Sequence, residues 1–327
     1  MKYRKLGANG PTVSAIGLGA GSTTTDFGER DDAVQVATLQ RAVDLGVTFF
    51  DTADRYMKGR HEHLLGQALK GRRDRVVIAS KFGNFDLPGG RKGYNGKPGY
   101  VPQACDASLK NLGVDHIDLY YLHRIDPEVP IEDTVGAMAE LVRKGKVRWL
   151  GLSEAGPSSL ARATRIHPIT ALQTEYSLWA RDIEDQILPA CRRLGIGFVA
   201  YAPLGRGLLT GTVRSLGDIA EHDLRRRQPR FQPGNIERNL ELLKPMETIA
   251  AARGVATAQI ALAWLLAQGE DIIPIPGTKQ QKWLEQNVAA LDVVLSDADL
   301  QLLGRTFRLG ARAGERYAPG YFTTLGA

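Results

Sequence analysis

Four polar residues in the first half of the chain have the types needed to move a proton onto a carbonyl group. They are Asp51, Tyr56, Lys81 and His123. A free tyrosine, with a pKa of about 10, is a poor acid at neutral pH, but an adjacent lysine ammonium favours the phenolate and lowers that pKa. A carboxylate can hold the lysine in place, and a histidine can orient a carbonyl oxygen. Together they would donate a proton to a carbonyl oxygen while hydride arrives at the carbon.

Taken singly, each of these residues has an ordinary structural explanation. Asp51, in the segment Phe-Phe-Asp-Thr-Ala, could cap the next helix, and Tyr56 could be a half-buried loop aromatic. Lys81 could be a surface lysine at a strand end, and His123 could be a core histidine with its hydrogen bonds satisfied. Catalysis is favoured only if the fold brings all four to one place.

The elements that would do so are short β-rich runs that alternate with amphipathic helical segments. The runs lie at 13–19, 47–51, 76–80, 117–122, 147–152, 171–174, 196–201 and 272–275. Residues 76–79 and 196–200 are largely apolar, as strands buried on both faces of a parallel sheet require. Eight such strands with helical crossovers predict an α/β fold, a (β/α)8 TIM barrel; an open doubly wound sheet is the structural competitor.

The segments outside these runs complete the expected organisation. The whole chain, 1–327, is predicted to be a single domain, with the barrel at about 13–291. Residues 1–12 are expected to form a small β-hairpin, and 305–327 a C-terminal tail with little periodicity. The long irregular stretch of about 204–238, rich in Gly, Arg and Pro, is expected to be either functional or disordered, because structureless loops of that length are uncommon in compact domains.

Polar residues recur where the runs end, which is the position of the active site in a TIM barrel. Asp51, Lys81, His123 and Ser153 follow or end the second to the fifth runs, Gln173 and Tyr201 stand late in the sixth and seventh, and Gly277 and Thr278 follow the eighth. Their convergence at one end of the barrel is more informative than any one residue. The sequence therefore predicts one site built from many strands.

Composition argues against several other classes of protein. The net charge of +6 is a mild and mostly dispersed excess. The cluster Arg225, Arg226, Arg227 and Arg230 is interpreted first as a solvated loop; a nearby anionic cofactor is an alternative, and a nucleic-acid surface is disfavoured because no aromatic platform accompanies it. With two cysteines, no apolar signal-peptide core and no membrane-length apolar run, a reducing cytoplasm is the expected compartment.

Familiar nucleotide and metal motifs are absent from the sequence. Residues 17–21, Gly-Leu-Gly-Ala-Gly, do not form Gly-x-Gly-x-x-Gly, and no Gly-x-x-x-x-Gly-Lys-[Ser/Thr] loop occurs. Residues 61–63, His-Glu-His, lack the spacing of a His-Glu-x-x-His zinc site. A metal site is therefore not predicted.

Four ordered motifs resemble those of the aldo-keto reductase family, and the similarity runs from about Leu6 to Leu291. They are 50–56, similar to an Asp-Thr-Ala-x-x-Tyr segment; 61–69, similar to an Asn-Glu-x-x-Leu-Gly-x-Ala-Leu helix with His61 in place of Asn; 118–123, similar to an Asp-Leu-x-x-x-His strand; and 151–154, similar to a Gly-hydrophobic-Ser-Asn/Glu turn.

This resemblance implies an oxidoreductase that reduces aldehydes or ketones to alcohols. In it Tyr56 is the general acid, Lys81 tunes the tyrosine, Asp51 pairs with the lysine, and His123 directs the substrate carbonyl. The assignment agrees with the roles that the residue types suggest by themselves.

The resemblance also implies a nicotinamide cofactor, NADPH (NADP+ when oxidised). Ser153 and Gln173 would bind the nicotinamide carboxamide, Tyr201 would stack on its ring, and Gly21 would let the backbone approach its ribose. Lys279 would contact a ribose 2′-phosphate, which favours NADPH over NADH. The segment 202–208 would wrap the pyrophosphate, with Arg206 as a charge partner, and the long arginine-rich loop would help cover the bound cofactor. The full predicted set of cofactor-binding residues is Gly21, Ser153, Glu154, Gln173, Tyr201, Pro203, Leu204, Gly205, Arg206, Gly207, Gly277, Thr278, Lys279, Gln286 and Asn287.

Two other functions stay open at this point. Channel-associated β subunits resemble aldo-keto reductases, so the barrel could be a cofactor-binding regulatory subunit with little turnover. A metal-dependent hydrolase would need converging ligands, but of the six histidines only His123 stands convincingly at a strand end.

The expected partner is a small or aromatic carbonyl substrate bound among 82–100, 124–127 and Trp179, with no nucleic acid and no membrane. Neither the physiological substrate nor the oligomeric state follows from the sequence.

Overall fold

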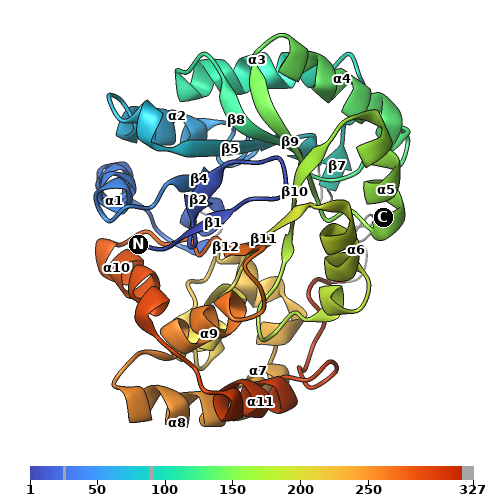
Figure 1. Ribbon diagram of the computed structural model, residues 1–327. Helices are drawn as coiled ribbons and strands as arrows, with labels where there is room; N and C mark the ends of the chain where they lie inside the picture. Colours follow the sequence, from blue (N-terminus) through green and yellow to red (C-terminus); the bar gives the residue numbers. More distant parts are fainter. Residues whose placement is uncertain (25–26, 88–91, 319–327) are drawn as a thin grey trace.

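The computed structural model describes residues 1–24, 27–87 and 92–318, and in this part of the chain eight parallel strands form one sheet (Figure 1). In chain order they are β3 (Leu18–Gly19), β4 (Phe49–Asp51), β5 (Val77–Phe82), β8 (Ile117–Leu122), β9 (Val147–Ser153), β10 (Ile169–Glu175), β11 (Gly197–Tyr201) and β12 (Ile272–Pro274). Each strand pairs with its neighbours in this order. The Gly17 amide donates to the Pro274 carbonyl at 2.9 Å, across the gap between the first and last strands. The predicted barrel is confirmed, and the open sheet is not formed.

Helices surround the barrel (Figure 1). They are α1 (Asp32–Asp44), α2 (Arg60–Ala68), α3 (Val101–Leu112), α4 (Ile131–Arg143), α5 (Pro157–Ile166), α6 (Ile187–Leu194), α7 (Asn235–Glu241), α8 (Lys244–Arg253), α9 (Thr257–Leu266), α10 (Gln281–Val288) and α11 (Asp297–Thr306). Short 3-10 turns add η1 (Gly21–Thr23), η3 (Arg73–Arg75), η5 (Asp182–Glu184) and η10 (Ala289–Asp292). The crossover from β11 to β12 carries three helices, and α8 packs on both α9 and α11.

Two apolar layers hold the barrel together. Alternate strand residues, among them Phe49, Leu119 and Val199, form a cluster with Ile273. Intervening residues such as Phe50 and Tyr120 belong to the larger cluster that also contains the helix residues facing the sheet. Both faces of each strand are therefore buried, as the largely apolar runs predicted.

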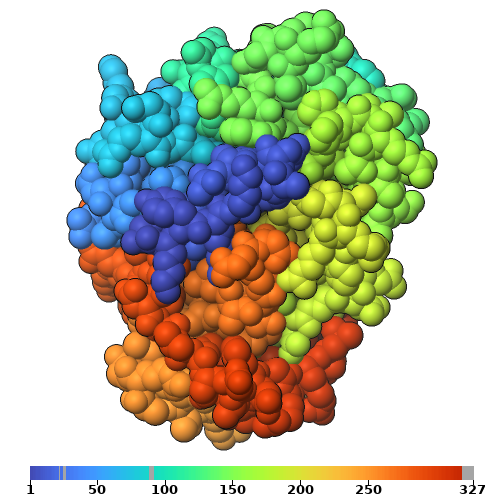
Figure 2. All heavy atoms as spheres, in the orientation of Figure 1, coloured from blue at the N-terminus to red at the C-terminus, as the bar shows by residue number. Residues whose placement is uncertain are grey.

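An N-terminal hairpin lies against the end of the barrel at which the strands begin. It consists of β1 (Tyr3–Lys5) and β2 (Thr12–Ser14), which pair antiparallel. Arg4 donates to the Ile272 carbonyl at 2.7 Å, and a Cβ on Gly7 would lie 2.3 Å from the Thr170 carbonyl oxygen. Figure 2 shows this segment, in dark blue, lying across the face of the molecule toward the viewer. The opposite end of the barrel is left for the site.

The predicted boundary between hairpin and barrel is wrong by a few residues. The run 13–19, taken as one strand, divides into the second hairpin strand and β3. The Ser14 hydroxyl donates to the Ile16 carbonyl at 2.7 Å, and the Ala15 amide donates to the Lys2 carbonyl at 2.9 Å. These bonds extend the hairpin and turn the chain before it enters the barrel.

The stretch 204–238 is more regular than its composition suggests. It contains η6 (Gly205–Thr210), η7 (Leu216–Asp218), η8 (Leu224–Arg227) and η9 (Pro229–Phe231), and α7 begins within it. The interpretation of its arginine cluster as a solvated loop is wrong for three members. Arg225 pairs with Asp223, Arg226 donates to the carbonyls of Leu216, Ile219 and Ala220, and Arg230 is 2% exposed. Backbone carbonyls and buried carboxylates bind these guanidiniums, a tertiary effect that a local charge count does not register.

Two further segments differ from the expected layout or only partly match it. The segment 82–100 contains a second hairpin, β6 (Asn84–Asp86) paired with β7 (Lys92–Tyr94). The predicted tail from 305 begins inside α11, and its residues 319–327 lie outside the described part, as do 88–91.

Within the described residues, no single helix is long and apolar enough to span a bilayer. The consecutive helices α8 and α9 meet that criterion only when joined, and they are bent by 96° relative to each other.

Leu6 anchors the hairpin, and its loss should destabilise the fold. Leu6 is fully buried and joins the cluster that contains Phe49 and Val199. Leu6→Ala should lower the free energy of unfolding by about 2–5 kcal/mol, because it removes buried methyl groups and leaves a cavity. Denaturant titration measures this change. Tyr3→Ala, on the same hairpin at 54% exposure, is the control; an equal loss in both variants would contradict the anchoring role.

Candidate active site

A buried ion pair lies at the C-terminal ends of β4 and β5. The Lys81 ammonium donates to one carboxylate oxygen of Asp51 and, at 2.8 Å, to the Thr52 carbonyl. The Gln173 amide donates to the other oxygen of Asp51 at 2.7 Å. Burial raises the pKa of Asp51, and the Lys81 ammonium and the Gln173 amide oppose that rise. With every charge paired and hydrogen-bonded, this cluster can exist inside the barrel.

The Tyr56 ring stands next to this pair. Lys81 Nζ lies 5.5 Å from the centre of the Tyr56 ring, and the ring meets His123 edge to face at 5.9 Å between centroids. A Cβ on Gly21 would lie 3.3 Å from the Tyr56 hydroxyl oxygen. The structure thus brings together the four residues predicted to form the site, with the first-strand glycine beside the hydroxyl.

His123, at the end of β8, is held as a neutral imidazole. It is 5% exposed, and burial, with the nearby charges of Arg124 and Lys81, keeps its pKa well below the usual value. Its Nδ1 has no hydrogen-bond partner among the described residues. A neutral ring can exchange a hydrogen bond with a carbonyl substrate without carrying a charge into the site.

The residues implied to bind the nicotinamide lie on neighbouring strands but are bonded to the protein itself. Strand register places Ser153 opposite Gln173. The Ser153 hydroxyl accepts from Arg124 at 3.0 Å, and Gln173 donates to Asp51. The Tyr201 hydroxyl also has a partner within the protein, the Glu154 carboxylate. A ligand carboxamide bound here would exchange places with these internal partners.

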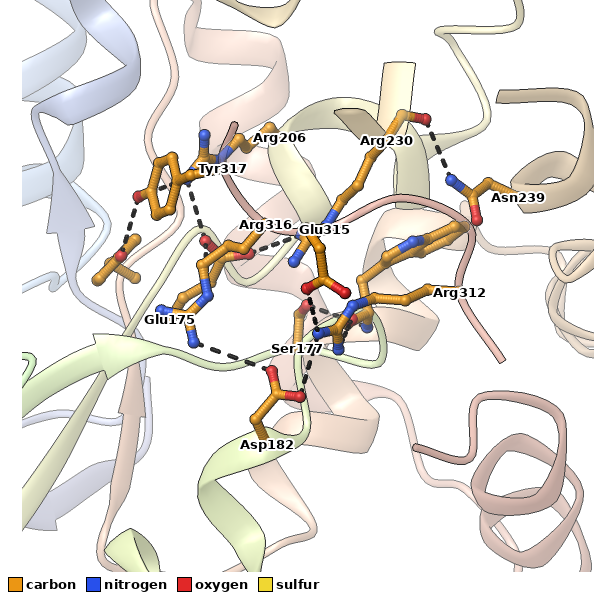
Figure 3. Close-up of polar contacts among 12 residues, drawn as sticks. Glu175, Ser177, Asp182, Arg206, Arg230, Asn239, Arg312, Glu315, Arg316 and Tyr317 are labelled. Atoms are coloured by element: carbon orange, nitrogen blue, oxygen red, sulfur yellow. Dashed lines mark hydrogen bonds and ion pairs between the residues drawn. The ribbon is translucent and has the colours of Figure 1, made fainter. Parts of the chain in front are cut away.

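Arg206, implied as a partner for pyrophosphate, is engaged elsewhere. Its guanidinium contacts Glu175 at 3.0 Å and the Tyr317 hydroxyl at 2.7 Å (Figure 3). Arg230 contacts the second oxygen of Glu175 at 2.8 Å. Although burial opposes it, Arg230, Arg206 and Arg316 lower the pKa of Glu175 to about 2. In this structure Arg206 is therefore paired with a buried carboxylate rather than left available for a phosphate.

Sequence analysis missed the C-terminal side of this network. Arg316 donates to both carboxylate oxygens of Glu154, at 2.9 and 3.0 Å, and the Tyr201 hydroxyl donates to one of them at 2.8 Å. The Tyr201 and Tyr317 hydroxyls are 3.2 Å apart. The signal available in the sequence was weak: Glu175 shares a strand face with Gln173, but nothing in the aperiodic tail marks Arg316.

Backbone strain is concentrated around the same residues. Among the described residues, those other than glycine with positive φ are Met57, Lys58, Glu154, Ala202 and Arg206. Each lies within two residues of Tyr56 or Ser153, or in the loop that follows Tyr201. Such conformations cost free energy and persist where the surrounding structure holds them, often at functional sites.

The predicted cofactor-binding residues Gly277, Thr278 and Lys279 follow β12, and Gln286 and Asn287 lie in α10. Gly277 and Gln286 are half-buried, and Thr278 and Asn287 are buried. The Lys279 ammonium donates to three consecutive backbone carbonyls, those of Phe27, Gly28 and Glu29, at 2.8 to 2.9 Å. Lys279 therefore joins the loop after β3 to the loop after β12. Of the remaining predicted residues, Pro203 and Gly205 are buried, and Leu204 and Gly207 are half-buried.

Several residues of the recognised motifs support the site from outside. Glu62 is fully buried and accepts from Ser80 at 2.6 Å and from Asn111 at 2.9 Å. Asp118 accepts from the Ile78 amide at 2.8 Å.

Trp179, expected to line a substrate pocket, is 2% exposed and packs edge to face on Phe307. No group of three or more His, Cys, Asp or Glu side chains in the described ranges is arranged to hold a metal ion.

Asp54 should make stability depend on pH near neutrality. Burial and the nearby Glu62 carboxylate raise the pKa of Asp54 from 3.8 to about 7. The folded state thus holds this proton more tightly than the unfolded state, so the stability that Asp54 contributes is full below pH 4 and is lost as pH rises through 7. Asp54→Asn removes this dependence. Its melting temperature relative to wild type should rise by roughly 2–4 °C between pH 5 and pH 8.

Thermal melts of both proteins at several pH values test this expectation. Asp185→Asn removes the same charge from an exposed position and serves as the control. A difference between Asp54→Asn and wild type that stays constant from pH 5 to pH 8 would contradict the raised pKa.

Comparisons with known proteins agree with this geometry. The model of the Aldo/keto reductase family matches residues 15–305. Aldo-keto reductase yakc [NADP(+)] of Schizosaccharomyces pombe is 44% identical over 323 residues, covering 97% of this chain and 94% of that protein. Probable aldo-keto reductase 1 of Glycine max is also 44% identical, covering 97% and 92%.

Solved structures are similar over almost the whole chain. A glycerol dehydrogenase of Gluconobacter oxydans superimposes with a TM-score of 0.85 at 26% identity, covering 97% of this chain and 98% of that one. An aldo-keto reductase of Klebsiella pneumoniae in complex with NADPH gives a TM-score of 0.74 at 28% identity, covering 96% and 99%. With the motifs at 50–56, 61–69, 118–123 and 151–154, these matches confirm the predicted resemblance: the chain belongs to the aldo/keto reductase family.

Proposed function

We propose that this protein reduces aldehydes or ketones to alcohols with NADPH, and that Tyr56 is the general acid. Family membership makes the chain an oxidoreductase. The observation that supports the finer proposal is the buried Asp51–Lys81 pair beside the Tyr56 ring and the neutral His123. This is the set of groups that proton donation to a carbonyl oxygen requires.

The residues of the site fit a nicotinamide cofactor. The position that a Cβ on Gly21 would take is 3.3 Å from the Tyr56 hydroxyl, so glycine leaves room for a ligand beside the acid. Ser153 and Gln173 offer a hydroxyl and an amide on adjacent strands, suited to a carboxamide. The cofactor relevant here, NADPH, supplies hydride when bound. Its identity is supported by the printed name of the fission-yeast relative and by the NADPH complex of the Klebsiella pneumoniae enzyme.

The chain's own residues would then act in distinct ways. Asp51 holds Lys81 in place, so that the ammonium lies beside the ring of Tyr56, the proposed proton donor. His123 orients the carbonyl oxygen toward Tyr56 through a hydrogen bond from its neutral ring. The low-dielectric surroundings of these groups strengthen each interaction.

The substrate class is proposed from the loops around the tetrad. The described residues of 82–100 and the segment 124–127 lie beyond the ends of β5 and β8, where they would surround a carbonyl held near His123. Their aromatic and apolar members suit small or aromatic aldehydes and ketones. A reducing cytoplasm stays the proposed compartment, and both Cys105 and Cys191 are free and buried.

Tyr56→Phe tests the acid directly. The variant should bind NADPH nearly as wild type does and lose most reductase turnover, by roughly 10²–10⁴-fold, because only the proton donor is removed. NADPH oxidation at 340 nm across a panel of aldehydes measures turnover, and calorimetry measures binding. Undiminished turnover would reject Tyr56 as the acid. Tight NADPH binding by wild type without turnover on any carbonyl would favour a cofactor-binding regulatory subunit.

Lys279→Ala tests the preference for NADPH. Lys279 now bonds to three carbonyls, which a 2′-phosphate can replace with a charge-assisted bond. The variant should raise the KM for NADPH roughly tenfold more than the KM for NADH, because one ion pair to the phosphate is lost. Steady-state kinetics with both cofactors provide the internal control: equal effects on the two would mean that Lys279 only fastens the loop.

A further inference from the structure

The chain after α11 crosses the ends of three strands on the cofactor side of the site. We call residues 311–318 the C-terminal strap. The Ala313 amide and carbonyl both bond to Asn239, and Arg312 donates to the Trp179 carbonyl at 3.2 Å. Figure 3 shows Arg312, Arg316 and Tyr317 directed toward residues of the barrel loops. The strap is thus anchored at one end and reaches the network around Glu175.

The strap contacts Glu154 through Arg316. Glu154 is a buried carboxylate at the point where β9 enters its loop. Glu154 is 2% exposed with a φ of 57°, so its conformation is strained and its charge is removed from water. It accepts hydrogen bonds from Arg316, from the Tyr201 hydroxyl and, at 3.2 Å, from the Glu175 amide. Arg316 supplies a guanidinium that contacts this carboxylate, and the buried Arg124, which donates to the neighbouring Ser153, also attracts it electrostatically.

This carboxylate lies next to the residues proposed to hold the nicotinamide. It follows Ser153 directly in the chain, and one hydrogen bond joins it to Tyr201, whose ring is proposed to stack on the nicotinamide ring. The second carboxylate of the network, Glu175, is engaged by Arg206 and Arg230. Removal of Arg316 would therefore lower the net charge on the nicotinamide side of the network by one unit, with Glu154 left next to Arg124 as its remaining cation.

A charge at that place acts differently on the two redox forms of the cofactor. The nicotinamide ring is a cation in NADP+ and is neutral in NADPH, so a nearby negative charge favours the oxidised form and a nearby positive charge disfavours it. Buried charges act over several ångströms with little screening. Proteins tune cofactors through such charges near the reacting ring.

We propose that Arg316, by pairing with Glu154, offsets the negative charge of this carboxylate at the nicotinamide end of the site and thereby sets how strongly the protein prefers NADPH over NADP+. Arg316 is a positioning residue, because it acts through Glu154 rather than by touching the reacting atoms. The proposal rests on the proposed function, which places the nicotinamide at Ser153 and Tyr201.

A double-mutant cycle tests this proposal. The dissociation constants of NADPH and NADP+ are measured by calorimetry for wild type, Arg316→Leu, Glu154→Gln and the double variant. Arg316→Leu should lower the ratio of the NADP+ constant to the NADPH constant roughly tenfold, and Glu154→Gln should raise it by a similar factor, because the two substitutions leave charges of opposite sign. The double variant, which removes both charges, should return the ratio to within about threefold of wild type.

Two controls separate this effect from simple damage to the fold. Arg308→Leu removes the same charge from an exposed position just after α11 and should leave the ratio unchanged. If Arg316→Leu fails to fold with an unpaired carboxylate, Glu154→Gln still decides the question. In that variant Arg316 keeps Glu175 and Asp182, each 3.9 Å away.

The outcomes are distinguishable. Opposite shifts in the two single variants, cancelled in the double variant, would support the proposal, since a purely structural role would weaken both cofactors alike. Binding of both cofactors with an unchanged ratio across the cycle would overturn the role of Arg316 and leave the proposed function standing. Failure of wild type to bind either cofactor would reject the proposed function and this inference with it.

Discussion

The ion pair between Lys81 and Asp51 is the constraint around which the site is built. A lysine and an aspartate removed from water inside a barrel are tolerated only when each charge is paired and its remaining hydrogen-bonding groups are satisfied. Strands β4 and β5 place the two side chains side by side, and the Thr52 carbonyl and the Gln173 amide complete the contacts. The pair holds an ammonium 5.5 Å from the centre of the Tyr56 ring, and both of its side chains come from strands of the barrel.

On the side of the site proposed to bind the cofactor, the polar groups have partners within the protein itself. Ser153 is bonded to Arg124, Gln173 to Asp51, and Lys279 to three backbone carbonyls. Leaving such groups buried and unbonded would destabilise the protein, so the structure satisfies them internally. Binding of a cofactor would then be an exchange of hydrogen bonds rather than a net gain of them, and affinity would come from the charges of the phosphates and from the stacking surface.

Charge also links the far end of the chain to this side of the barrel. Glu154 directly follows β9, and Glu175 ends β10. The arginines that pair with these buried carboxylates come from three separate segments: the loop after β11, the η9 turn and the C-terminal strap. Each arginine brings its own segment onto the barrel mouth. The network therefore organises the loops, and the strained backbone at Glu154 and Arg206 lies at its two ends.

The sequence by itself determined the barrel, because the apolar runs and the helical crossovers leave little choice of architecture once both sheet faces must be buried. It also predicted that Asp51, Tyr56, Lys81 and His123 would lie close together, because each stands at or after a strand end and parallel strands bring those ends together; the structure shows this proximity. Local pattern failed where contacts are made between distant segments. The run 13–19 divides because Ser14 and Ala15 bond within the hairpin, and Arg230 is buried because Glu175 receives it. Only the tertiary structure decided that Arg316 meets Glu154, because an aperiodic tail carries no local signal and its position is set by the charge it pairs with.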